Sequence, residues 1–183
     1  MEQPGVLQIV ADVALPSAAI IISTVVAVWL ARSERKAAAA ARADERTDAA
    51  FVRTLVALST LNTINLRAES ASEPFRELRV GLTLLAAVTP ERTDDLLGQW
   101  FEAERRAGLA QATESMRLLA TVPDPLRTDT DVEAMVAAGA PVNTWARDFA
   151  NNLRLWRRKG TTDAELTSLI VSAKNRSSGT AAA

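Results

Sequence analysis

Eighteen consecutive residues without a charge, Val13 to Leu30, constrain this chain more than any other stretch of it. A helix rises about 1.5 Å per residue, so the run covers roughly 27 Å, close to the bilayer's hydrocarbon thickness of about 30 Å. A buried helix of a globular core is the alternative, but uncharged runs of this length are typical of membrane spans. The sequence therefore predicts a single transmembrane helix near the N-terminus.

The charges that flank this run predict its orientation. No Lys or Arg precedes the run, whereas a cleaved signal peptide needs a positive start, so we expect an uncleaved signal anchor. Basic residues follow the run directly, and an indole near its end suits the membrane interface. The predicted interface residues are Trp29, Arg32, Arg35 and Lys36. Because cytoplasmic flanks have the excess of Lys and Arg, we expect a single-pass protein of the cell inner membrane with its N-terminus outside.

Small residues recur every four positions within the predicted span, at Ala19, Ser23 and Ala27. Such a stripe lets two helix backbones approach closely, and it would support a homo-oligomer in the membrane. Ala and Ser are also common in membrane spans that make no such contact. Both interpretations of the stripe stay open at this stage.

The composition excludes most catalytic chemistry. The chain has no Cys and no His, so it lacks the thiolate nucleophile, the usual general base near neutral pH and the commonest metal ligands. Asp129-Thr130-Asp131 resembles the start of a calcium loop, but Ala134 and Ala140 stand where that loop needs Gly and Glu. The seven glycines form no phosphate-binding loop. We expect no enzyme, no cofactor and no metal site.

Beyond the anchor the pattern of apolar residues predicts an all-α chain with a small cytoplasmic helical bundle. Strand-like alternation is scarce, and Ala, Arg and Glu, which are strong helix formers, dominate the stretch after the span. The predicted organisation is an outer tail and transmembrane anchor at 1–31, a helical stalk at 32–50, a helical cytoplasmic domain at 51–176 with a hinge near 122–128, and a disordered tail at 177–183.

Glycines and capping patterns predict where the helices of this domain begin and end. Gly suits the position just beyond a helix, whereas Thr followed by Pro, or Ser or Thr three residues before Glu, suits its start. On this basis one helix starts at Thr89-Pro90-Glu91 and ends at Gly108, a short one is capped by Thr130 and Glu133 and ends at Gly139, another runs from Pro141 to Lys159, and the last is capped by Thr162 and Glu165.

The segment from Pro141 to Lys159 has aromatic residues on one helical face and is the most basic region of the chain. We expect its aromatic face in the core of the bundle, with the arginines in water. Contact with anionic lipid, or with a protein or nucleic acid, is the alternative. The candidate contact residues are Trp145, Phe149, Arg154, Trp156, Arg157, Arg158 and Lys159.

Together these features predict a non-catalytic scaffold that holds a cytoplasmic protein, or copies of itself, at the inner face of the membrane. With a formal net charge of -1 the chain has no overall field that would attract nucleic acid, so lipid and protein are the expected partners. The alternative is a membrane-active effector of the phage or toxin kind, similar to a holin, which acts by oligomerisation of its span. A helical domain of this size exceeds what such a pore-former needs.

Overall fold

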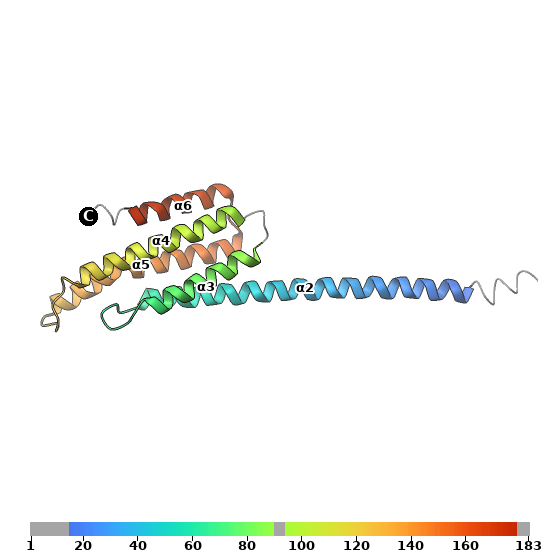
Figure 1. Ribbon diagram of the computed structural model, residues 1–183, viewed down its shortest axis with the longest axis horizontal. Coiled ribbons are helices and arrows are strands. Elements are labelled where there is room, and N and C mark those ends of the chain that lie inside the picture. The colour runs from blue at the N-terminus through green and yellow to red at the C-terminus, as the bar shows by residue number, and fades with distance from the viewer. Residues whose placement is uncertain (1–14, 90–93, 179–183) are drawn as a thin grey trace, which may run out of the picture. The chain divides into compact units, whose positions relative to one another are not determined.

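The computed structural model describes the backbone of residues 15–89 and 94–178 and the side chains of residues 27–89 and 95–178. Every regular element in these ranges is a helix, so the predicted all-α class is confirmed. The helices are α2 (Leu15–Thr63), α3 (Ser72–Val88), α4 (Asp94–Leu119), α5 (Asp129–Lys159) and α6 (Asp163–Ser178), as Figure 1 shows. The last helix extends two residues into the predicted C-terminal tail.

The chain divides into two units, residues 1–45 and residues 46–183. The first unit contains the N-terminal part of α2, in which every described side chain, from Ala27 to Glu45, is exposed. No helix of the described residues is long and apolar enough to cross a membrane. Most of the predicted span lies outside the described residues, because residues 13–14 are not described and residues 15–26 have no described side chains.

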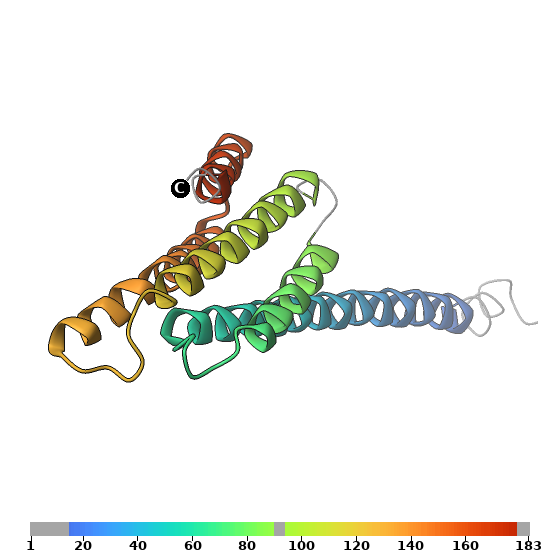
Figure 2. The same ribbon diagram turned by 60° about the vertical axis from the view of Figure 1, so that its left-hand side comes forward.

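The predicted helical bundle is confirmed, and its described helices lie in the second unit. The end of α2 and all of the helices after it contribute an apolar face to one core, which includes both fully buried indoles, Trp100 and Trp145. α4 is central, since it contacts α5, α6 and α3. Figures 1 and 2 show α4 lying alongside α5 and α6. Apolar residues at helical spacing explain this arrangement, because each helix buries its apolar stripe in the core and leaves its polar face in water.

Two predicted helix ends are wrong, because both glycines lie inside longer helices. Gly108 is within α4, where a Cβ atom would collide with the indole of Trp145, so the glycine allows close approach of α5 and does not end the helix. Gly139 and Pro141 lie within α5, which is therefore one helix and not two. Pro141 removes one donor, and the next backbone N–H, of Val142, donates to Ser115 Oγ on α4 at 3.2 Å.

The caps of α5 and α6 differ in how well the sequence predicts them. α5 begins with a capping box of Thr128 and Asp131, two residues before the predicted pair, so the prediction of Thr130 and Glu133 is wrong. The predicted cap of α6 is confirmed, because Thr162 N–H donates to Glu165 Oε2 at 2.8 Å and Glu165 N–H donates to Thr162 Oγ1 at 3.3 Å. The predicted start of α4 at Thr89-Pro90-Glu91 includes residues outside those described.

The predicted hinge at 122–128 is the connection between α4 and α5, and a single arginine holds it. Arg67, in the connection between α2 and α3, donates to the carbonyl oxygens of Leu119, Val122 and Pro123 at 3.5, 2.7 and 3.0 Å. These oxygens lie at or just beyond the end of α4, where backbone acceptors lack helical partners. The arginine therefore joins two connections at the same end of the bundle.

Candidate functional site

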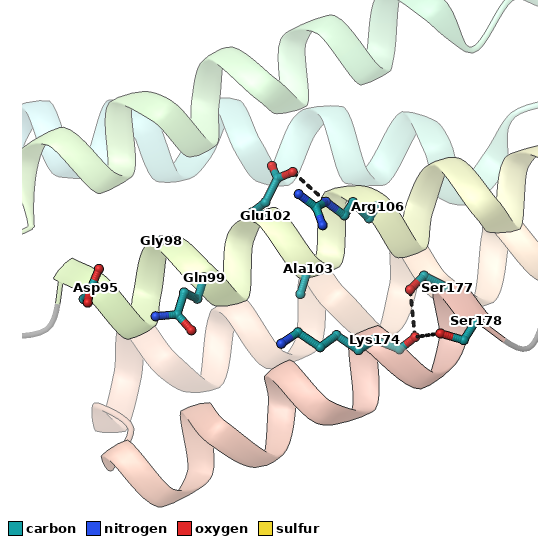
Figure 3. A pocket seen from close by; sticks show the side chains of 9 residues that line it. All are labelled: Asp95, Gly98, Gln99, Glu102, Ala103, Arg106, Lys174, Ser177 and Ser178. Carbon is teal, nitrogen blue, oxygen red and sulfur yellow. Dashed lines mark hydrogen bonds and ion pairs between the residues drawn. The ribbon is translucent and has the colours of Figure 1, made fainter.

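A groove of about 960 Å³ lies between the outward face of α4 and the end of α6. Six of its residues recur on α4 at spacings that place them on one helical face, and Lys174 extends from α6 toward them (Figure 3). Its residues are Asp95, Gly98, Gln99, Glu102, Ala103 and Arg106 from α4, and Lys174, Ser177 and Ser178 from α6.

A second groove, of about 260 Å³, lies on the other side of the same face of α4 and shares Gly98 and Glu102 with the first. Its α3 residues are Arg79, Leu82, Thr83 and Ala86, and α4 adds Phe101 and Arg105. We call the residues of both grooves the α4 trough, since α4 forms its floor and α3 and α6 form its walls.

Glu102 lies at the centre of the α4 trough and is bonded to two arginines. Arg105 donates from Nε and Nη2 to its two carboxylate oxygens, each at 2.8 Å, and Arg106 Nε donates to Oε1 at 2.8 Å. These bonds favour the ionised form and lower the pKa of Glu102 to about 2, with the hydrogen bonds from Arg105 as the largest cause. The carboxylate is thus charged at any physiological pH and does not serve as a proton donor.

The α4 trough has a net positive charge, unlike the whole chain. It has four cationic side chains, those of Arg79, Arg105, Arg106 and Lys174, against the two acidic ones of Asp95 and Glu102, which gives +2. Arg79 and Lys174 are exposed, and among the described residues neither makes an ion pair. These two cations are available to a binding partner.

Beyond the trough, two large apolar side chains are exposed on the outward face of α4, beside Thr113 and Arg117, whose guanidinium pairs with Glu114. Leu109 and Met116 follow Arg106 at helical spacing and are 44% and 52% exposed, with Thr113 between them. A large apolar side chain that is half exposed is common when isolated, but two on one helical face beside an open groove favour an interaction surface.

The opposite face of α4 has a fully buried carboxylate, Glu104, that joins three helices. Trp145 Nε1 of α5 donates to Glu104 Oε2 at 3.0 Å, and Arg176 Nη2 of α6 donates to Oε1 at 2.7 Å. Trp100 Nε1 adds a longer bond of 3.3 Å to Oε1. Burial of a charge is costly unless it is paired and hydrogen-bonded, and here both oxygens have donors. The network holds α6 in one register along α4 and so shapes one wall of the α4 trough.

The residues of α5 that were predicted to contact lipid or a partner fall into two groups, aromatic residues that are buried or half-buried and basic residues that are exposed. Trp145 and Phe149 are buried, and Trp145 also stacks on Phe75 at a centroid distance of 5.8 Å. Trp156 is half-buried with its ring edge-on to Phe101 at 6.3 Å. This is the core position that the sequence predicts for the aromatic face, and the rings of Trp145 and Phe149 are not exposed to a membrane or a partner.

The basic members of the same set are exposed at the end of α5. They are Arg154, Arg157, Arg158 and Lys159. Arg157 pairs with Asp48 of α2 at 2.7 Å, and Arg154 donates to Asn151 at 3.1 Å. Their position in the last turns also suits the negative end of the helix dipole.

The residues predicted for the membrane segment lie on α2. The side chains of Ala19 and Ser23 are outside those described, and Ala27 is exposed. The predicted interface residues Trp29, Arg32, Arg35 and Lys36 are all exposed on the same helix.

Sequence reasoning missed the α4 trough and Glu104. Gly98, Leu109 and Met116 are spaced as one face of a helix and could have indicated an outward apolar stripe. Glu104 lies among other charged residues, but it follows Leu97, Trp100 and Phe101 at spacings of seven, four and three, and this helical periodicity could have placed it on the buried face. Its burial depends on Arg176, which is 72 residues away in the chain.

The described residues contain no group of three His, Cys, Asp or Glu side chains that could hold a metal ion. Asp131, in the segment that resembles a calcium loop, instead accepts backbone hydrogen bonds from Arg127 and Thr128, each at 2.9 Å. The bond from Arg127 is the largest cause of the lowered pKa of Asp131. This acid therefore caps a helix.

Comparisons with protein-family models, with curated proteins and with solved structures found no match to this chain. A function must therefore be inferred from its own residues and geometry.

Proposed function

We propose that this protein is a non-enzymatic scaffold, held at the inner face of a membrane by its N-terminal apolar segment, that binds proteins through its helical bundle. The observation behind the proposal is the uncharged run from Val13 to Leu30 followed by Arg32, Arg35 and Lys36. Its length matches a bilayer, and its basic flank favours the cytoplasmic side for the rest of the chain.

The bundle supports the binding part of the proposal. Its core residues all lie between Ala50 and Ala173, outside the apolar segment. Its surface has a groove with unpaired cations and an exposed apolar stripe, which are features of protein-binding surfaces. A chain without Cys or His has few of the groups from which a catalytic centre is usually built, and the proposal includes no catalytic step.

The test combines membrane extraction with reporter fusions after Ala183 in bacterial cells. We expect the chain to remain in membranes washed with alkaline carbonate, a fused fluorescent protein to be bright and a fused alkaline phosphatase to be inactive. Ile21→Arg places a charge in the middle of the run, which costs about 2.5–3.5 kcal/mol on insertion scales, and should release part of the chain. Val52→Arg, at an exposed position of α2, is the matched control and should not.

Two results would contradict the proposal. Complete extraction of the unmodified chain by carbonate would exclude an integral anchor, and an active phosphatase would reverse the orientation. Membrane depolarisation on expression of the apolar segment alone would favour the holin-like effector, with the stripe of Ala19, Ser23 and Ala27 as its contact face.

A further inference from the structure

We propose that the α4 trough, together with the exposed Leu109, Thr113 and Met116 that follow it on α4, binds the N-terminal part of α5 from a second copy of this chain, so that the bundles assemble head to tail. The inference deepens the proposed scaffold, on which it rests, by naming the chain itself as one of its partners. The bound segment is Asp129–Ala140, which we call the acidic segment.

The acidic segment has an exposed face whose chemistry is complementary to the α4 trough. Val132 and Val136 are 44% and 65% exposed, and Asp129 and Glu133 are exposed beside them. At 100° per residue these four side chains lie within one third of the helix circumference. No Lys or Arg occurs from Thr128 to Ala146, so the face is purely acidic and apolar.

The order of charges and apolar residues along the two surfaces gives the docking a direction. On α4 the cations of the trough come first and the apolar Leu109 and Met116 follow, and the next cation, Arg117, is already paired with Glu114. On the acidic segment the carboxylates come first and Val136 and Ala140 follow. A parallel arrangement of the two helices therefore places acid against cation and apolar against apolar.

The acidic segment is long enough to span the α4 surface from the last cation of the trough to the last exposed apolar residue. From Arg106 to Met116 a helix advances roughly 15 Å, and from Asp129 to Ala140 it advances roughly 17 Å. Exposed apolar residues spaced along a helix are typical anchors for a partner helix in a groove.

The cations of the trough have donors left for a carboxylate of the second copy. In the described contacts Arg106 uses only Nε to bond Glu102, so its terminal amino groups remain. Lys174 and Arg79 make no ion pair within the described part of the chain. Arginine forks favour bidentate bonds to carboxylates, which adds direction to the contact.

The two surfaces lie on different helices, so one copy can bind one neighbour through its α4 trough and another through its acidic segment. Such heterologous contacts form open chains, or rings where the rotation closes. Under a membrane they would gather several copies in one plane, which suits a scaffold.

The chain has no Cys, so single cysteines report the contact without background. Full-length Thr113→Cys and full-length Val132→Cys are co-expressed, and a short bismaleimide is added to native membranes. We expect a crosslinked heterodimer between them. Thr113→Cys with Leu155→Cys is the matched control, because Leu155 is exposed to the same 44% as Val132 but lies outside both surfaces, and its yield should be at least fivefold lower.

A charge swap tests the pairing itself. Lys174→Glu in the Thr113→Cys copy, or Glu133→Lys in the Val132→Cys copy, should each lower the yield at least threefold. The two changes together should restore the yield to within twofold. Val136→Asp should lower it at least fivefold, while Val52→Asp, at a position of similar exposure, should not.

Equal yields at the test and control positions, or no recovery in the charge swap with unchanged thermal unfolding of the variants, would overturn the inference. Crosslinking of the Thr113→Cys copy only to other proteins would assign the trough to a different partner and would also overturn it. Carbonate extraction of the same membranes separates this failure from a failure of the anchor, because loss of self-docking leaves the chain membrane-bound.

Discussion

At the scale of single residues, Glu104 is a buried carboxylate whose stability in the core depends on its hydrogen-bonding and ionic partners. It is fully buried, whereas its partner Arg176 has a side chain that is 31% exposed. Arg176→Met leaves an unpaired buried carboxylate, and breaking a buried pair in this way typically costs about 3–5 kcal/mol. We expect that loss in denaturant unfolding followed by tryptophan fluorescence.

Removing the charge of Glu104 should destabilise the fold less than removing its arginine partner. Glu104→Gln keeps an acceptor for an indole and leaves an arginine that water can reach, so its cost should be that of a charged hydrogen bond, about 1.5–3 kcal/mol. Equal losses of unfolding free energy in Arg176→Met and Glu104→Gln would show that an unpaired carboxylate at position 104 is no more costly than an unpaired arginine at position 176.

Glu102 gives a pH-dependent prediction. Its pKa in the folded chain is about 2, below its ordinary value of 4.5, so its ion pairs stabilise the fold fully above about pH 4.5. That contribution is lost as the pH falls from 4.5 toward 2, and it is small because the side chain is 42% exposed. In an NMR titration Arg105→Ala should raise this pKa toward 4.5, while Arg117→Ala, which removes the partner of Glu114, should leave it unchanged.

At the scale of elements, α4 contains two glycines whose replacement by alanine should change the stability of the bundle in opposite directions. A Cβ atom at Gly108 would collide with the Trp145 ring, whereas at Gly98 it would meet nothing within 4 Å. Gly108→Ala should therefore destabilise the bundle by about 1–3 kcal/mol through overpacking. Gly98→Ala should stabilise it by up to about 1 kcal/mol, since Ala favours a helix.

Thermal or denaturant unfolding of both variants checks this prediction. A neutral Gly108→Ala would mean that α5 shifts away from α4 at little cost, and the close packing of the two helices would then not depend on this glycine.

At the scale of the whole molecule, the core residues among the described side chains all belong to the unit 46–183. If the chain is anchored in the orientation proposed above, brief trypsin treatment of inside-out membrane vesicles should cut among the exposed basic residues Arg32, Arg35, Lys36, Arg42 and Arg46. We expect a released fragment that keeps its helical circular dichroism and unfolds cooperatively, because it retains the whole core. A fragment that is degraded further, or that stays with the membrane, would contradict the independence of the bundle.

The sequence by itself determined the features that depend on neighbours along the chain. Helical periodicity of apolar residues predicted the all-α class, and Thr162 with Glu165 predicted the start of α6, because capping acts over three residues. The same local rules failed at Gly108 and Gly139, because a glycine that ends a helix and one that admits a neighbouring side chain look alike in sequence.

Only the tertiary structure decided which face of each helix is buried and which charges meet. Trp145 lies in the core because α4 presents Gly108 to its ring, and Glu104 is tolerated there because Arg176 reaches it from α6. The α4 trough exists because α3 and α6 rise on either side of one exposed face. Contacts between distant segments depend on how the helices pack, and packing is a property of the assembled core that no short stretch of sequence specifies.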